Sequence, residues 1–417
     1  MSFQSIRVQI SSKMLMNNPG FSVAFLLFLC AAVALAAEPE PRVFTVLPGA
    51  LSAAKARADA GDPAIKPALK QLIADADKAL KFKPETVMDK PQMPPSGDKH
   101  DYMSQAPYFW PDPAKSDGLP YIRKDGQRNP ESYDGHSDAP RMGRMATSAE
   151  SLALAAWFTG NDNYAERAAD LLRAWFLAPE TRMNPNFDYA QAVPGVNTGR
   201  GTGMIESRSI IPAMETADLL AGSKHWSPAD QQGMEAWMRA FLAWAQTSPN
   251  GKAEAGARNN HGSYYDEQIV AMALFLGETD LAKQTLEAVK TKRIAAQIKP
   301  DGSQPLELAR VDSFGYSRFN VMALCSLATM GGHVGIDLWR YETPGGGSLR
   351  KAIDFLLPYV EEPDKEWPYE HGHKGVRNLA AQLWEAGFVY GEPRYTDAAR
   401  KSSGIEKTRE ALFYPAK

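Results

Sequence analysis

Apolar side chains recur every three or four residues along most of this chain, and this spacing limits the folds that it can adopt. Such a stripe is typical of an amphipathic helix that buries one face. The four clearest stripes span residues 63–80, 162–175, 228–245 and 349–360. Side chains that commonly cap a helix precede them: Asp62, Asn161, Ser227 and Ser348. The pattern predicts an all-α protein.

Weaker helical patterns fill much of the remaining chain. They span residues 144–158, 205–221, 263–276, 279–290, 315–330 and 376–390. The best strand signal is Val43–Leu47. No Ser, Gly or Pro-rich linker divides the chain after residue 40, so a single domain of helical hairpins is expected, arranged as a solenoid or closed toroid. An open helical bundle is the alternative.

The N-terminal residues have the features of an export signal. Residues 1–20 contain Arg7 and Lys13 and no acidic residue, and residues 21–36 are apolar and end in an Ala-Leu-Ala cleavage pattern. A membrane anchor would need roughly 20 apolar residues, which is longer than this run. We therefore expect a signal peptide at 1–36, with Met14 and Met16 as alternative starts.

The predicted mature domain, residues 37–417, has no later run of transmembrane length. We expect it to be exported, periplasmic or secreted, and not held in a membrane. Of the two cysteines, Cys30 lies in the predicted signal peptide, so the mature chain keeps only Cys325 and cannot form an intramolecular disulfide.

The balance of charges limits the partners. There are 46 Lys and Arg against 49 Asp and Glu, a formal net charge of -3, and 44% of the residues are hydrophobic. This composition excludes a disordered chain and argues against a nucleic-acid-binding protein. An acidic ligand would have to be held by a local cluster of basic side chains.

Two long segments lack a helical pattern, residues 84–140 and 183–204. Long irregular segments in a compact domain are usually binding loops or lids. The second contains Gly199-Arg200-Gly201-Thr202-Gly203, but no strand pattern precedes it, so a dinucleotide site is not expected there.

Familiar cofactor and metal motifs are absent from the sequence. It contains no H-E-x-x-H, no paired C-x-x-C, no G-x-S-x-G and no Walker loop. His371 and His373 are close in sequence but have no convincing third ligand. No cofactor and no metal site are predicted.

Two clusters of polar residues point to a specific chemistry. Residues 258–266 read Arg-Asn-Asn-His-Gly-Ser-Tyr-Tyr-Asp, and residues 307–318 contain Glu, Arg, Asp, Tyr and a second Arg. Cleavage of a uronic acid polymer by β-elimination requires neutralisation of the C6 carboxylate, removal of the C5 proton and protonation of the leaving O4. An amide, an imidazole and a guanidinium can neutralise the carboxylate, and a tyrosine can transfer the proton. In β-D-mannuronate and β-D-glucuronate, C5-H and O4 lie on one ring face, so one tyrosine can serve both steps.

The same residues resemble a known family. The resemblance rests on the stretch Asn259–Asp266, on Glu307–Arg310 followed by Tyr316-Ser317, on His100–Ser104 and on Ala106–Pro113. These motifs are similar to those of the alginate lyase superfamily, and most similar to polysaccharide lyase family 38. The resemblance covers essentially the whole mature chain. It implies an (α/α) toroid, incomplete or closed, and metal-independent β-elimination on glucuronan or mannuronate-type alginate.

The resemblance also implies roles for individual residues. Tyr316 matches the tyrosine that acts as base and acid in a syn elimination. Asn260 and His261 match the pair that neutralises the carboxylate, and Arg310 matches the arginine that favours the phenolate. His261 is an alternative base for an anti elimination. Val311 stands where the family often has threonine.

A wider set of residues is expected to bind substrate. Aromatic rings of the segment after residue 100 can stack on sugars, with core packing as the alternative. Arg208 and Glu254 are candidates for the cleft or for structural ion pairs. The substrate-binding candidates are Asn259, Arg208, Glu254, Tyr108, Trp110, Tyr102, His100, His371 and Arg318.

Two other functions remain open from the sequence. A glycoside hydrolase would need two carboxylates about 5–10 Å apart, for which the candidates are Asp266, Glu267, Glu307 and Asp312. A non-catalytic polysaccharide-binding protein would need the aromatic residues alone. In all three cases the expected partner is a polysaccharide, which is anionic for a lyase.

Overall fold

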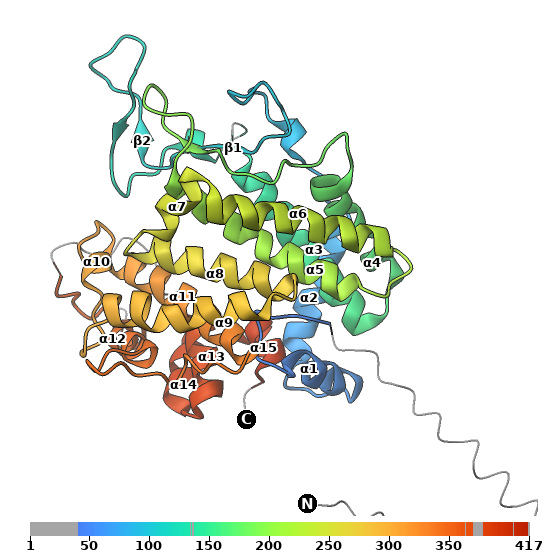
Figure 1. Ribbon diagram of the computed structural model, residues 1–417. Coiled ribbons are helices and arrows are strands. Elements are labelled where there is room, and N and C mark those ends of the chain that lie inside the picture. Colours follow the sequence, from blue (N-terminus) through green and yellow to red (C-terminus); the bar gives the residue numbers. More distant parts are fainter. Residues whose placement is uncertain are drawn as a thin grey trace, which may run out of the picture. The chain divides into compact units, whose positions relative to one another are not determined.

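Helices make up most of residues 41–417 in the computed structural model (Figure 1). The structure describes residues 41–133, 135, 137–362, 364–369, 378–402 and 404–415, and 41–417 group as one compact unit. The predicted signal peptide, and the predicted binding residue His371, lie outside the described residues. No described helix is both long and apolar enough to cross a membrane.

Fifteen α-helices are found in the described residues. They are α1 (Ala50–Asp59), α2 (Lys66–Ala79), α3 (Ala139–Thr159), α4 (Asp162–Leu172), α5 (Ile211–Leu220), α6 (Pro228–Thr247), α7 (Pro249–Ala255), α8 (Asn260–Phe275), α9 (Thr279–Val289), α10 (Pro305–Leu308), α11 (Ser313–Gly332), α12 (Leu349–Glu361), α13 (Ala380–Tyr390), α14 (Pro393–Arg400) and α15 (Arg409–Phe413).

Other helical segments, which are 3-10 or π helices, connect several of them. These are η1 (Val87–Asp89), η2 (Pro130–Ser132), η3 (Arg173–Leu177), η4 (Gly201–Ile210), η5 (Lys290–Ala295) and η6 (Ile405–Lys407). The all-α prediction is confirmed.

Three of the four predicted N-caps are confirmed. The side chains of Asn161, Ser227 and Ser348 each accept a hydrogen bond from a backbone N–H of the first helical turn, which satisfies a donor that the helix itself leaves free. The prediction for Asp62 is wrong. Its carboxylate accepts from the N–H of Ala64 in a turn, and α2 begins only at Lys66.

Two other expectations are corrected. Val43–Leu47 is not a strand, because its backbone bonds to side chains: the Thr45 N–H donates to Glu215 and the Leu47 N–H to the Tyr414 hydroxyl. The pattern at 205–221 is not one helix, since η4 covers its first part and α5 begins at Ile211. Pro212 lies in the first turn of α5, where a missing N–H costs nothing.

Consecutive helices pack in pairs, as the prediction of helical hairpins requires. α3 packs against α4, α8 against α9, and α13 against α14. α3 also contacts α2 and α5, and α8 also contacts α11, so these two helices join neighbouring pairs. One large apolar core runs through these contacts.

The four short strands found in the described residues all come from the two long irregular segments. β1 (Met103–Gln105) pairs in parallel with β4 (Tyr189–Ala192), and β2 (Phe109–Trp110) pairs antiparallel with β3 (Ile122–Arg123). The β1–β4 pair brings the two segments side by side. Residues 107–128, called here the β2–β3 hairpin, extend from the helical part of the unit (Figure 1).

A buried ion pair anchors the first of these segments. Lys90 is fully buried, donates to two backbone carbonyls, and lies 3.2 Å from Asp138. Asp138 accepts from the Met103 N–H at 3.0 Å. Burial raises the pKa of Asp138 to about 6, against the lowering effect of Lys90. The pair therefore fixes β1 to the start of α3.

Candidate active site

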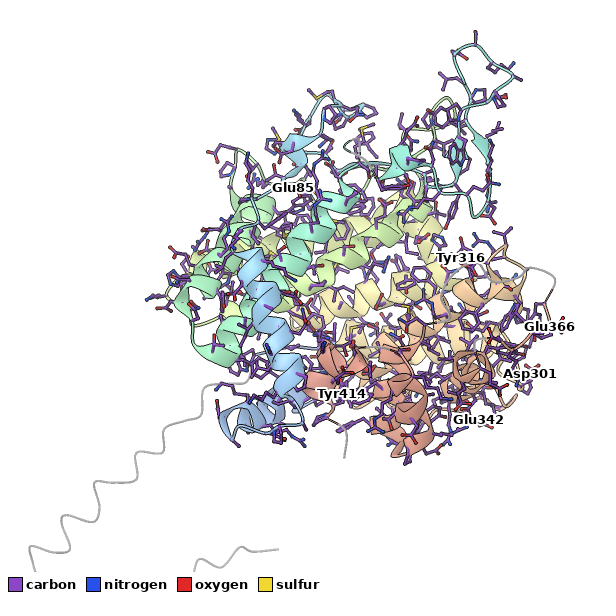
Figure 2. The ribbon with its side chains drawn as sticks, turned by 180° about the vertical axis from the view of Figure 1, so that it is seen from behind. Glu85, Asp301, Tyr316, Glu342, Glu366 and Tyr414 are labelled. Carbon is purple, nitrogen blue, oxygen red and sulfur yellow. The ribbon has the colours of Figure 1, made fainter. Side chains whose placement is uncertain are left out.

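Both irregular segments and both polar clusters meet at one cleft. Its volume is about 720 Å³, and its lining comes from four stretches of the chain: 105–140, 191–209, 257–261 and 310–319. The prediction that segments 84–140 and 183–204 form binding loops agrees with this placement. Figure 2 labels Tyr316 on the side of the helical part that faces the β2–β3 hairpin.

His261 lies at the first turn of α8 and is oriented by a buried carboxylate. Its Nδ1 is 2.6 Å from Oε1 of Glu254, whose side chain is only 1% exposed. A carboxylate accepts a hydrogen bond, so Nδ1 carries the proton and Nε2 keeps its lone pair in the neutral ring. Asn259, the N-cap of α8, accepts from the His261 N–H and also lines the cleft.

Asn260 is held by a second buried carboxylate. Its backbone N–H and its Nδ2 each donate to Glu307 at 2.7 Å. Burial raises the pKa of Glu307, although the hydrogen bonds from Asn260 oppose this. Because a carboxylate accepts from Nδ2, the amide orientation is set. Oδ1 is then left buried and without a partner among the described residues.

The other side of the cleft carries Tyr316 and Arg310. The Arg310 guanidinium lies 3.7 Å from the centre of the Tyr316 ring and forms an ion pair with Asp125 of the β2–β3 hairpin at 3.1 Å. The Tyr316 hydroxyl donates to the Tyr108 hydroxyl at 3.0 Å. Gly126 of the same hairpin lies against the side chain of Val311. The β2–β3 hairpin therefore contacts Arg310, Tyr316 and Val311.

Opposing effects act on the Tyr316 phenol. Burial raises its pKa well above the ordinary value, and the hydrogen bond to Tyr108 raises it further. The positive charge of Arg310 lowers it, in the direction predicted, but does not offset burial. Tyr316 is therefore a protonated phenol near neutral pH in the free protein.

The other predicted binding residues divide into two groups. Arg208, Asn259 and Tyr108 line the cleft. Arg208 lies over the Tyr264 ring at 5.4 Å, and no carboxylate of the described chain forms an ion pair with it. Glu254 does not line the cleft itself. Its carboxylate orients the ring of His261, which does line the cleft.

Four predicted residues lie outside the lining of the cleft. Tyr102 is fully buried, stacks on Phe187 at 4.0 Å, and cannot stack on a sugar, so that prediction is wrong. Trp110 donates to the Gln127 carbonyl. His100 contacts the Arg182 carbonyl through Nδ1, and Arg318 donates to the Asn378 carbonyl. Each of these three contacts joins a side chain to the backbone of a residue 17 to 82 positions away, which a local sequence pattern does not reveal.

The structure adds three arginines and one carboxylate to Arg208 and Arg310, the two cleft residues of this kind that the sequence had already singled out. Five arginines line the cleft, and Glu206 is the one carboxylate among the lining residues described. The arginines are Arg123, Arg128, Arg200, Arg208 and Arg310. The cleft is thus cationic although the whole chain is slightly acidic.

The four carboxylates proposed for a hydrolase do not line the cleft. Asp266 pairs with Arg293, and Glu267 is buried. Glu307 holds Asn260, and Asp312 caps α11. Among the described residues, no group of three or more His, Cys, Asp and Glu is arranged to hold a metal ion.

Comparisons with known proteins point to one family. A family model described as Alginate lyase matches residues 86–367. A crystal structure of an alginate lyase from Bacteroides ovatus is 40% identical over 91% of this chain and 100% of that chain, with a TM-score of 0.85. No match was found among curated proteins.

More distant structures share the fold. Alginate lyase A1-III from Sphingomonas species A1 is 16% identical, over 91% of this chain and 99% of that chain, with a TM-score of 0.59. A histidine-to-alanine variant of A1-III complexed with tetrasaccharide is 15% identical, over 91% and 98% of the two chains, with a TM-score of 0.62.

Proposed function

This chain belongs to the alginate lyase family and is a polysaccharide lyase, and we propose that it cleaves β-1,4-linked glucuronan or mannuronate-rich alginate by a metal-independent syn β-elimination. One observation carries the proposal. A single cationic cleft brings together the Tyr316 phenol, with Arg310 across its ring, and the oriented pair Asn260 and His261.

Asn260 and His261 are proposed to neutralise the C6 carboxylate of the unit that is cleaved. The ionised carboxylate makes the C5 proton too weakly acidic to remove, so its charge must be shared by nearby donors. Asn260 has a second Nδ2 hydrogen beyond the one that Glu307 accepts. The His261 ring, when protonated, can donate from Nε2 while Nδ1 stays bonded to Glu254, and the Asn260 amide donates whether or not the ring carries this charge. Both carboxylates that hold this pair are buried, so substrate binding need not rearrange them.

Tyr316 is proposed to transfer the proton. As phenolate it takes the C5 proton; the C4–O4 bond then breaks, a C4–C5 double bond forms, and the phenol returns the proton to the departing O4. Arg310 lowers the pKa of Tyr316 and so favours the form that starts the reaction. Because burial and Tyr108 raise the same pKa, kcat/KM should rise with pH across the alkaline range.

The alternative base, His261, predicts a different pH dependence. If His261 takes the C5 proton, Tyr316 would act only as the acid and would have to keep its proton. The value of kcat/KM would then fall, and not rise, as Tyr316 loses its proton at high pH. The pH profile therefore separates the two assignments.

An oligosaccharide partner is consistent with the A1-III variant structures, which are described as complexed with tetrasaccharide. The arginine-rich lining suits an anionic polymer in this chain too. We also propose that residues 1–36 direct export, so that the mature enzyme meets polymer in the periplasm or outside the cell. N-terminal sequencing of the protein from its native host would test the cleavage point.

Ultraviolet absorbance during incubation with glucuronan, poly-mannuronate and poly-guluronate tests the function. A syn lyase should produce the unsaturated uronate chromophore from the first two polymers. A hydrolase would release reducing ends without a chromophore, and a binding protein would do neither. The absence of the chromophore with all polyuronates would refute the proposal.

A further inference from the structure

The cleft has a second polar surface that the elimination does not use. Three buried polar atoms of cleft-lining residues have no hydrogen-bond partner in the described structure: Asn260 Oδ1, Arg200 Nε and Thr202 Oγ1. Asn260 belongs to the proposed mechanism. The other two belong to residues 199–203, called here the Gly199–Gly203 strip. Buried polar atoms without partners are rare and need an explanation.

The glycines of the strip hold it against the backbone of its neighbours. A Cβ on Gly199 would lie 1.9 Å from the Asp188 carbonyl oxygen, and one on Gly203 would lie 2.5 Å from the Ala190 carbonyl oxygen. A Cβ on Gly201 would lie 2.7 Å from Cβ of Ala253 in α7. Only glycine permits this close packing.

The residues between these glycines face the cleft. Arg200 is extended, with φ -155° and ψ 159°, so its side chain points away from the packed side of the glycines on either side. Both Arg200 and Thr202 line the cleft. The three glycines therefore pack against neighbouring segments, while Arg200 and Thr202 are left facing the cleft.

Arg200 is fixed in position but keeps its charge available. Its Nη2 donates to Gln191 at 2.8 Å, and its guanidinium lies over the Phe109 ring at 5.1 Å. No ion pair joins it to a carboxylate of the described chain. Glu206, which shares the cleft, accepts from Tyr102 and Ser104 at 2.8 and 2.6 Å. A fixed guanidinium with a free donor is well suited to a carboxylate.

We propose that Arg200 and Thr202 bind a uronate unit of the polymer other than the one whose C5 proton is removed. This inference rests on the proposed function. Each uronate unit has a single carboxylate, and Asn260 and His261 take that of the reacting unit. The Arg200 guanidinium then meets the carboxylate of another unit, and the Thr202 hydroxyl bonds to one of its polar groups. The Glu206 carboxylate can accept from sugar hydroxyls, which a uronate unit offers beside its single carboxylate.

The strip also lies beside the catalytic side chains. Gly201 packs on Ala253, the residue before Glu254, which orients His261. Phe109 under Arg200 follows Tyr108, which bonds to Tyr316. A polymer that crosses the cleft can therefore contact the strip and Tyr316 at the same time.

Kinetics and direct binding of the variants Arg200→Gln and Thr202→Val test the proposal. Loss of the charge in Arg200→Gln should raise KM for polyuronate by about 10- to 100-fold, with kcat changed by about threefold or less. Thr202→Val should raise KM by about 3- to 10-fold. The KM of Arg200→Gln should also depend less steeply on ionic strength than that of the wild type.

Arg340→Gln is the matched control, because Arg340 is 62% exposed and pairs with Asp337 away from the cleft residues. Its KM should equal that of the wild type. Arg200→Lys keeps the charge and should recover part of the affinity. If Arg200→Gln does not fold, as judged by circular dichroism, Arg200→Lys and Thr202→Val decide the question.

The outcomes separate this inference from the proposed function. Calorimetry with an oligomannuronate or oligoglucuronate tetrasaccharide measures Kd independently of turnover. If the wild type turns over normally, and KM and Kd are unchanged in both Arg200→Gln and Thr202→Val, the inference about these two residues is overturned while the proposed function stands. A fall of kcat with constant KM would also overturn it, because it would place Arg200 in the chemical step. If the wild type forms no chromophore and the Arg200→Gln variant still binds the oligosaccharide more weakly than the wild type, only the elimination is refuted.

Discussion

The two sides of the cleft are built differently. Asn260 and His261 are held by Glu307 and Glu254, whose side chains are almost fully buried in the helical part of the unit. Arg310 and Tyr316 are held by Asp125 and Tyr108 of the β2–β3 hairpin, and Asp125 remains 23% exposed. The groups proposed to hold substrate charge are thus fixed by the core, while the group proposed to move a proton is held by the β2–β3 hairpin.

This difference has a thermodynamic consequence. Removing a buried acceptor leaves donors without partners in a medium where water cannot replace it, so the free energy of unfolding falls. Removing a partly exposed ion-pair partner costs little, because water compensates. Changes on the His261 side should therefore affect stability and activity together, whereas changes on the hairpin should mainly alter the pKa of Tyr316.

The largest effect is expected for Tyr316→Phe. The variant lacks the hydroxyl that is proposed to remove and return the proton, so kcat should fall by about 10²- to 10⁴-fold. The ring and its contact with Arg310 remain, so Kd for oligouronate should change little. The rate is measured by ultraviolet absorbance. Turnover close to that of the wild type would remove Tyr316 from the mechanism.

Glu307→Ala tests whether the Asn260 side is held by the core. The variant leaves the backbone N–H and Nδ2 of Asn260 without their acceptor, which should lower the free energy of unfolding by about 1–3 kcal/mol. Chemical denaturation measures this change, and kcat/KM should fall in parallel. A variant with normal stability and normal kcat/KM would show that the buried carboxylate does not organise this side.

Ser227→Ala is the control for stability alone. Ser227 caps α6 and forms a capping box with Asp230, outside the lining of the cleft. Its loss should lower the free energy of unfolding by about 1 kcal/mol. The kinetic constants should not change at a temperature where the protein stays folded. A change in KM would mean that general destabilisation reaches the cleft, and the Glu307→Ala result could then not be assigned to Asn260.

Asp125→Asn should have the smallest effect on stability and only a small effect on the rate. The Asp125–Arg310 pair is partly exposed, so kcat/KM at its optimum should change by about fivefold or less. The charge of Asp125 raises the pKa of Tyr316, so its removal should lower that pKa and move the alkaline rise of kcat/KM to lower pH. A shift to higher pH would show instead that Asp125 acts mainly by positioning Arg310.

Local sequence was informative where neighbouring residues decide the structure. Asn161, Ser227 and Ser348 were recognised as caps because a cap and its partner lie within one helical turn. Val43–Leu47 was misread as a strand, because the partners of its backbone, Glu215 and Tyr414, are far away in the sequence. Tyr102 was misread as a cleft residue for the same reason, since Phe187 covers its ring.

The sequence by itself determined the helical class, the family and the residues of the two polar clusters, because periodicity, capping and motifs are properties of short stretches. Tertiary structure alone decided which polar residues meet. It joined Glu254 to His261, Glu307 to Asn260 and Asp125 to Arg310, and it turned Arg200 and Thr202 toward the cleft. The physical reason is that burial and charge act through space. Asp125 can therefore hold the Arg310 guanidinium in place although the two residues are 185 positions apart in the sequence.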